Sequence, residues 1–241
     1  MKMTKHRFTA SILCMAANNI SLAHEAADPL ISMVSINQLE QRLNHDAQSN
    51  DRDISNWNAE VWLGKNLDKL WLKTEGEFVD GQREESELQV LYSRAIAPYW
   101  DLQTGWRGDF NPEQNQHWFA VGLQGLAPYF FEIDSALFFG KGGQTALRID
   151  AEYELMFTQK LILSPELETT LYSRNAPKYE QGSGLAKIDA GLRLRYEIRR
   201  EFAPYIGINW SKKYGNTADL SRADGGDIEA LQWVAGIRAW F

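Results

Sequence analysis

Residues 145–157 read TALRIDAEYELMF, and their pattern of apolar and charged residues indicates the fold class. Apolar side chains recur at every second position from Leu147 to Phe157, while Arg148 and several acids occupy most of the positions between them. A β-strand places alternate side chains on opposite faces, whereas a helix would scatter the same charges around its circumference. The stretch therefore predicts a strand with one apolar face and one charged face.

The same period of two dominates the chain from about residue 32 to its end. We count about twelve such segments, each near the roughly nine to eleven residues that a tilted strand needs to cross a bilayer. They are residues 32–42, 55–64, 69–79, 85–96, 100–110, 117–126, 130–140, 145–157, 161–173, 185–198, 203–214 and 230–241. The first is the weakest, because Met33 to Arg42 also fits a short helix. Bacterial single-chain barrels have even strand numbers, so we predict twelve strands, with ten as the alternative.

The connections between these segments alternate in length. Short turns are expected at 65–68, 97–99, 127–129, 158–160 and 199–201, and longer polar links at 44–54, 80–84, 111–116, 141–144, 175–184 and 215–228. Short periplasmic turns alternating with longer extracellular loops are typical of outer-membrane barrels.

Aromatic residues gather at the short-turn ends, where a girdle would meet lipid headgroups. They are Tyr99, Trp100, Tyr129, Phe130, Phe131, Phe202 and Tyr205, and the chain ends in Trp240-Phe241 on a final amphipathic segment. We predict an all-β fold, an antiparallel transmembrane up-and-down β-barrel in the outer membrane of a Gram-negative bacterium. A soluble β-sandwich with these aromatics in its core is the alternative.

The N-terminus resembles a secretory signal peptide. Lys2, Lys5 and Arg7 precede an apolar stretch, and small residues follow at Ser21 and Ala23. We expect residues 1–23 to be the signal peptide, 24–31 a short periplasmic segment, and 32–241 the barrel; a short buried helix is the alternative for the leader. Cleavage after residue 23 would remove the only cysteine and the thiol chemistry that it offers.

The net charge of the chain favours cations over nucleic acid as its ligands. The formal net charge is -7, and an acidic chain repels phosphate. By alternation, the charged face of the strands turns into the lumen, where acids outnumber bases about two to one. The densest cluster is Glu132, Asp134, Asp150, Glu152 and Glu154, which we interpret as a path that favours cations, as charged rings do in channels. Arg–carboxylate pairs that simply brace the interior are the alternative.

Several strings of the sequence are similar to the copper resistance protein B family. They are GLAPYFFE (125–132), LILSP (161–165), GSGL (182–185), GLRLRYEIRREFAPYIG (191–207), VAGIRAWF (234–241) and LWLKTEGE (70–77), so that the resemblance spans about residues 33–241. It implies an outer-membrane barrel of copper resistance that works beside periplasmic partners, including a multicopper oxidase. Many family members carry a Met- and His-rich segment before the barrel, and here only residues 24–30 separate the expected cleavage site from the first strand.

Soft ligands for copper are correspondingly few. Thioethers and imidazoles select copper, whereas carboxylates hold it loosely. His24 beside a new amino terminus, His45 in a predicted loop and Met156 beside Glu154 in the lumen are the candidates, and His117 is expected at the rim or toward lipid. We therefore expect copper to be weakly bound.

The predicted function is the handling or passage of copper ions across the outer membrane. A plugged structural barrel that docks a periplasmic copper oxidase, and a general small cation-preferring porin, are the alternatives. An outer-membrane hydrolase ranks behind them, because no GxSxG motif occurs and Ser183 has no evident base nearby in the sequence. We expect no catalytic residues and no resident cofactor besides copper, with lipid, copper ions and the oxidase as partners.

Overall fold

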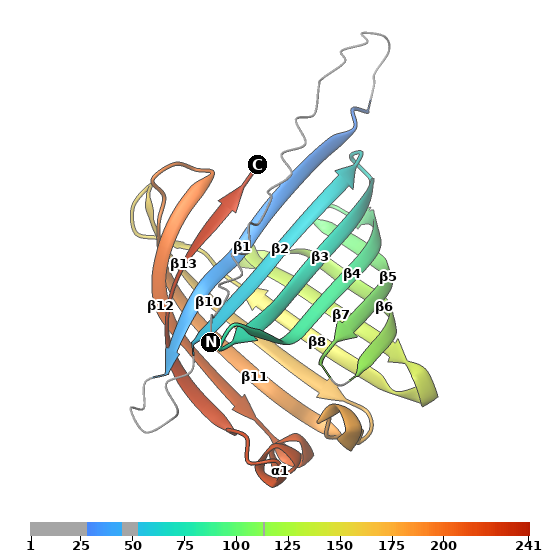
Figure 1. Cartoon of the computed structure of the whole chain (residues 1–241). Helices are drawn as coiled ribbons and strands as arrows, with labels where there is room; N and C mark the ends of the chain where they lie inside the picture. Colours follow the sequence, from blue (N-terminus) through green and yellow to red (C-terminus); the bar gives the residue numbers. More distant parts are fainter. Residues whose placement is uncertain (1–27, 45–52, 113) are drawn as a thin grey trace, which may run out of the picture.

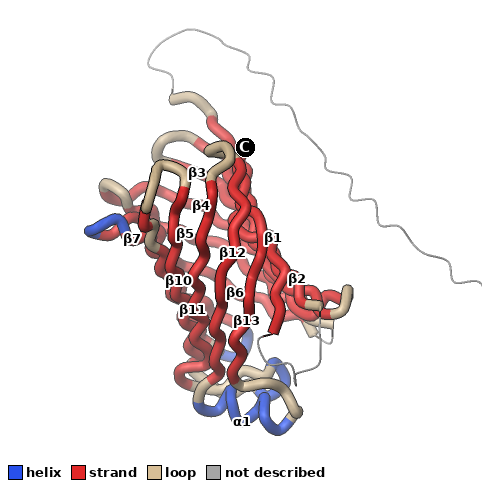
Figure 2. Tube along the Cα trace, turned by 90° about the vertical axis from the view of Figure 1, so that its left-hand side faces the viewer, coloured by secondary structure: helices blue, strands red, loops and turns tan. Residues whose placement is uncertain are grey.

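The computed structural model describes residues 28–44, 53–112 and 114–241, and most of them lie in β-strands (Figures 1 and 2). The strands are β1 (Ile31–Asn44), β2 (Ile54–Gly64), β3 (Asp68–Val79), β4 (Gln82–Ala97), β5 (Trp100–Phe110), β6 (Asn115–Ala127), β7 (Phe131–Gly140), β8 (Thr145–Glu152), β9 (Leu155–Met156), β10 (Leu161–Tyr172), β11 (Gly184–Tyr196), β12 (Phe202–Lys213) and β13 (Glu229–Trp240). The helix α1 (Gly215–Ala223) and three 3-10 turns, η1 (Pro128–Phe130), η2 (Lys141–Gly143) and η3 (Pro177–Tyr179), lie in the connections. The predicted signal peptide lies outside the described residues.

The strands form one closed barrel. Apart from β8 and β9, which do not pair with each other, each strand pairs antiparallel with its neighbours in the chain, and the pairing of β1 with β13 closes the sheet on itself. Both β8 and β9 pair with β10 and are two pieces of one wall strand, so the wall has twelve strands, as predicted. Closure leaves no unpaired sheet edge, which a bilayer would not tolerate.

A proline explains the interruption between β8 and β9. Pro165 on β10 accepts the N–H of Tyr153 through its carbonyl at 3.0 Å. A proline has no N–H to return to the neighbouring strand, so the ladder loses a bond at this point. Residues 153 and 154 therefore leave the regular pairing before β9 resumes it.

The first segment is a strand and not a helix, and it contains a β-bulge. The pairing of β1 with β2 shifts register between Ile36 and Gln38, and that with β13 shifts between Ile36 and Leu39. Asn37 and Gln38 are consecutive, yet both line the lumen. A bulge inserts one residue and changes the phase of the alternation, so a strict period of two fails across this segment.

The two ends of the barrel differ. The C-terminal end of β13 lies at the end with the short turns, and α1 lies at the opposite end (Figure 1). One expected long link is wrong: between β3 and β4 only Asp80 and Gly81 remain unpaired, and their φ angles of 52° and 75° form a tight hairpin turn. The helix α1, within the link at 215–228, was not predicted.

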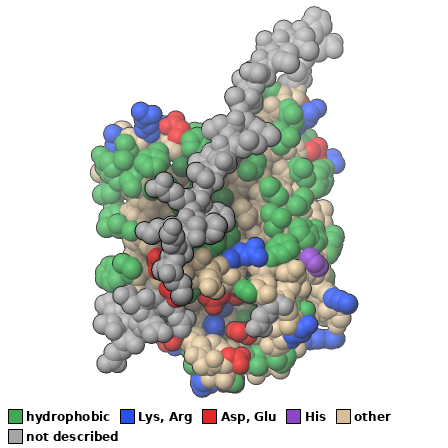
Figure 3. Space-filling model, viewed as in Figure 1, with side chains coloured by type: hydrophobic (Ala, Val, Ile, Leu, Met, Phe, Trp, Pro, Cys, Tyr) green, Lys and Arg blue, Asp and Glu red, His purple; other side chains and the backbone are tan. Residues whose placement is uncertain are grey.

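The outer surface is apolar. Large hydrophobic side chains such as Ile206 and Trp233, 65% and 55% exposed, cover the wall from outside. Figure 3 shows hydrophobic side chains along the left and right flanks of the visible face. Tyr99, Tyr129 and Phe130 project from the short turns and are strongly exposed, as a girdle requires.

The prediction that Tyr205 belongs to the aromatic girdle is wrong. Its side chain is buried and points inward, where its hydroxyl donates to Glu40. None of the helices in the part of the chain that the structure describes is long and apolar enough to cross a membrane.

Candidate functional site

The lumen contains a cavity of about 760 Å³ whose lining is dominated by charged and amide side chains. Of the predicted acid cluster, Glu132, Asp134, Asp150 and Glu152 line it and Glu154 does not, and acids outnumber bases along its wall. Glu154 and Glu197 instead line a smaller cavity near the short turns, together with Arg195 and Arg238. The predicted charged interior is therefore present.

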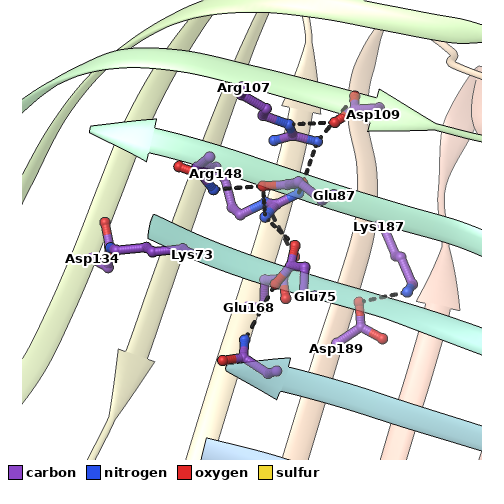
Figure 4. A network of polar contacts seen from close by, with 12 residues as sticks. Lys73, Glu75, Glu87, Arg107, Asp109, Asp134, Arg148, Glu168, Lys187 and Asp189 are labelled. Carbon is purple, nitrogen blue, oxygen red and sulfur yellow. Dashed lines mark hydrogen bonds and ion pairs between the residues drawn. The ribbon is translucent and has the colours of Figure 1, made fainter. Parts of the chain in front are cut away.

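Arg148 spans the middle of the lumen (Figure 4). From β8 it reaches Glu75 on β3 at 2.6 Å and Glu87 on β4 at 2.9 Å. Four wall strands separate β8 from β3 by the shorter way round, so this contact crosses the barrel. Arg107 joins the group, 2.7 Å from both Glu87 and Asp109.

An apolar cluster supports this crossing group from one side. The guanidinium carbon of Arg107 lies 4.4 Å from the ring centroid of Phe138, which is 1% exposed. Trp71 and Leu91 pack in the same cluster. The planar guanidinium is well suited to stacking on an aromatic face, so Phe138 fixes the orientation of the arginines that bridge the lumen.

A second polar group is centred on Glu40, whose side chain is fully buried. Glu40 accepts two hydrogen bonds from Arg193 on β11, each of 3.0 Å, one of 2.8 Å from Arg42, and one of 3.0 Å from the hydroxyl of Tyr205. Arg193 also contacts Glu166 on β10 at 2.5 Å. A carboxylate this buried is stable only when it is paired and hydrogen-bonded.

Acids of neighbouring strands face one another in register. Asp134, Asp150, Glu168 and Asp189 form one row across β7, β8, β10 and β11. Glu132, Glu152 and Glu166 form a second row beside it. Like charges placed directly opposite destabilise a sheet, so these rows cost stability.

The predicted acid cluster is thus brought together, but its members differ in their partners. Asp134 contacts Lys73 at 2.7 Å, Glu152 contacts Arg238 at 3.2 Å, and Glu154 contacts Arg195 at 2.6 Å. Glu132 and Asp150 make neither a hydrogen bond nor an ion pair with any described residue. The carboxyl groups of these two acids therefore have no direct basic partner among the described residues of the wall.

Of the predicted soft ligands, the structure describes Met156 and His117, and neither lines the lumen cavity. Met156 lies at the short-turn rim, is 70% exposed and does not line the cavity, contrary to its expected position beside Glu154 in the lumen. His117 lies on the exposed outer side, as expected, stacked on Trp106 with 5.7 Å between ring centroids. His24 and His45 lie outside the described residues.

Within 28–44, 53–112 and 114–241, no three His, Cys, Asp or Glu side chains form a group that could hold a metal ion. The hydroxyl of Ser183 accepts a hydrogen bond from Asn216 at 2.9 Å.

Several lumen residues were missed from sequence. Glu40 was not expected because the bulge in β1 changes the phase before it. Arg42, Glu85 and a set of amides line the cavity and were likewise not predicted: Asn37, Gln38, Asn56, Asn58, Gln89, Gln103, Gln116, Gln124 and Asn209. These amides alternate with apolar neighbours, and this pattern could have predicted them. The prediction used charged residues only and therefore missed the uncharged amides.

A closed antiparallel barrel with an apolar exterior and a charged lumen defines a transmembrane protein of the Gram-negative outer membrane. Solved outer-membrane barrels share this fold. The NanC porin matches with a TM-score of 0.57 and 11% identity, and the match covers 86% of this chain and 98% of the porin. The outer membrane phospholipase A of Escherichia coli has a TM-score of 0.53, 11% identity, and coverage of 85% and 92%. At such identities the likeness concerns the fold alone.

The sequence comparison identifies the family. The model of the copper resistance protein B precursor matches residues 30–241. Copper resistance protein B of Escherichia coli is 42% identical over 219 residues, which cover 90% of this chain and 72% of that protein. The homolog from Pseudomonas syringae pv. tomato is 43% identical over 193 residues, which cover 80% of this chain and 66% of the relative. The chain belongs to the copper resistance protein B family.

Proposed function

We propose that this barrel passes copper ions across the outer membrane as part of copper tolerance. The row of Asp134, Asp150, Glu168 and Asp189 carries this proposal. A wall that merely needed bracing would alternate acids with bases, whereas this row keeps like charges side by side at a cost in stability. Rings of acids lower the barrier for cations in channels.

The chemistry of the row suits passage rather than storage. Carboxylates are hard ligands that bind copper loosely and with little selectivity. Conduction requires binding strong enough to admit the ion and weak enough to release it. Family membership supports copper as the cargo, and the acid excess of the lumen supports cations in general.

A second function is favoured by Arg148. Its contacts with Glu75 and Glu87 cross the lumen, as in a plugged barrel. In that case the protein acts as a scaffold that docks a periplasmic copper oxidase. A general, small, cation-preferring porin is the third candidate.

Copper flux into liposomes distinguishes these functions. The purified, refolded barrel is compared with empty vesicles, and copper flux is compared with potassium flux in the same vesicles. We expect copper flux above both references. Equal flux of both ions indicates a general porin, and no flux from a protein that still runs as a heat-modifiable barrel indicates the scaffold.

A further inference from the structure

The connection between β10 and β11, residues 173–183, folds back over the barrel. Tyr179, Glu180 and Gln181 of this segment line the same cavity as Arg148 in the lumen below. Thr217 of α1 lines it as well. Both elements lie at the end opposite the short turns (Figure 1). They therefore cover the mouth on the side that faces the cell exterior.

A chain of amides holds the segment to the wall. Gln181 donates to Gln116 at 2.9 Å, and Gln116 donates to Gln144 at 2.8 Å. Gln116 belongs to β6, and two wall strands, β7 and β8, separate β6 from β10. Gln181 is 8% exposed, and its Oε1 has no hydrogen-bond partner among the described residues. The side chain of Gln181 is thus tied to β6 by a single hydrogen bond between two amides, and such a bond adds only modest net stability.

The helix α1 supports the segment from behind. The N–H of Gly182 donates to the hydroxyl of Thr217 at 3.0 Å, and this hydroxyl lies 3.3 Å from the carbonyl of Gly182. A Cβ at Gly182 would lie 2.1 Å from the backbone nitrogen of Thr217, so only glycine allows this approach. Asn216 also donates to Ser183. These contacts join α1 and the segment into one body.

We propose that residues 173–183 and α1 form a gate over the extracellular mouth, held closed by the contact between Gln116 and Gln181. When this contact breaks, the segment leaves the mouth and water-soluble solutes reach the lumen. The gate controls access to the lumen whether or not copper is the cargo.

The test measures access rather than flux, so that it is independent of the proposed copper passage. Thr170, which lines the cavity from β10, is replaced by cysteine in a chain that carries Cys14→Ser. The labelling rate by a neutral, water-soluble thiol reagent added from outside is then compared with and without Gln181→Ala. We expect labelling to be about tenfold faster in the Gln181→Ala variant, because the loss of one net hydrogen bond can change an equilibrium by about this factor. Equal rates would overturn the proposal.

Gln232→Ala is the matched control. Gln232 is also 8% exposed and donates to the amide of Asn44 at 3.0 Å, a contact between β13 and β1 that involves neither residues 173–183 nor α1. It should leave the labelling rate unchanged; an increase equal to that of Gln181→Ala would show general loosening and overturn the gate.

If Gln181→Ala fails to fold, a variant in which the gate can be cross-linked to the wall tests the proposal. Gln116→Cys and Gln181→Cys are joined by a short bifunctional thiol reagent with a cleavable disulfide, and a solute such as glucose is followed into liposomes. Uptake should fall on cross-linking and return on reduction. Uptake that ignores the cross-link would reject the gate.

Discussion

Asp150 on β8 and Glu168 on β10 lie directly opposite each other in the antiparallel ladder. Glu168 lies 3.5 Å from Arg148, whereas Asp150 has no ion pair with any described residue. The wall thus keeps one carboxylate in a position where its opposite neighbour repels it.

Asp150→Asn should stabilise the barrel, because it removes this repulsion. We expect a gain of about 0.2–1 kcal/mol in the free energy of unfolding, measured by urea unfolding of the refolded protein in detergent. Asp109→Asn is the control, since Asp109 accepts from both Arg107 and Trp118 and should lose stability when neutralised. A loss of stability in both variants would show that Asp150 has a stabilising partner after all.

Neutralising the whole acid cluster should reduce cation preference. The variant carries Glu132→Gln, Asp134→Asn, Asp150→Asn, Glu152→Gln and Glu154→Gln, and selectivity is measured as the reversal potential across a planar bilayer under a salt gradient. A control neutralises the same number of exposed acids outside the lumen and outside α1: Glu84, Glu201, Asp224, Asp227 and Glu229. Unchanged selectivity in the folded cluster variant would exclude these acids as the cation path.

Glu40→Ala should strongly destabilise the barrel, by about 3–5 kcal/mol, because it leaves Arg193 buried with one partner fewer. Tyr205→Phe should cost less, about 1.5–3 kcal/mol, since it removes a single hydrogen bond to a charged group. Both are measured by urea unfolding. Glu229→Gln, at an exposed pair with Lys212, should change stability little. Equal effects at Glu40 and Glu229 would contradict the central role of the buried carboxylate.

Arg148→Ala should increase single-channel conductance several-fold if the arginine narrows the path, because its contacts cross the lumen. Arg42→Ala is the control, since Arg42 contacts Glu40 on its own strand and does not cross. A conductance that rises in neither variant, in folded barrels, would favour a scaffold whose plug does not depend on Arg148.

Met156→Leu should leave copper flux in liposomes unchanged, because the thioether lies at the rim, outside the lumen cavity. The substitution keeps size and apolar character. A clear fall in copper flux, with potassium flux unaltered, would make Met156 a ligand on the copper path.

The period of two predicted the wall of this barrel almost residue by residue, because a bilayer on one side and a polar lumen on the other enforce alternation. It placed Asp134 and Asp150 on the inner face correctly. It could not show that Arg148 meets Glu75, since this contact crosses the barrel and depends on its closure and stagger. Tyr205 was assigned to the girdle because a tyrosine suits both an interface and a buried partner such as Glu40.

The bulge at Asn37 has a consequence for how this wall tolerates changes of length. Side chains along a membrane strand alternate between the lumen and the lipid, and β1 already contains one surplus residue between Ile36 and Gln38. Removing one residue there would straighten the strand and keep Glu40 turned toward Arg193. Adding one residue would either enlarge the bulge or rotate the buried carboxylate of Glu40 to the outer face, where it would meet the hydrocarbon of the bilayer. Within this strand, deletions and insertions of equal length are therefore unequal in their effect.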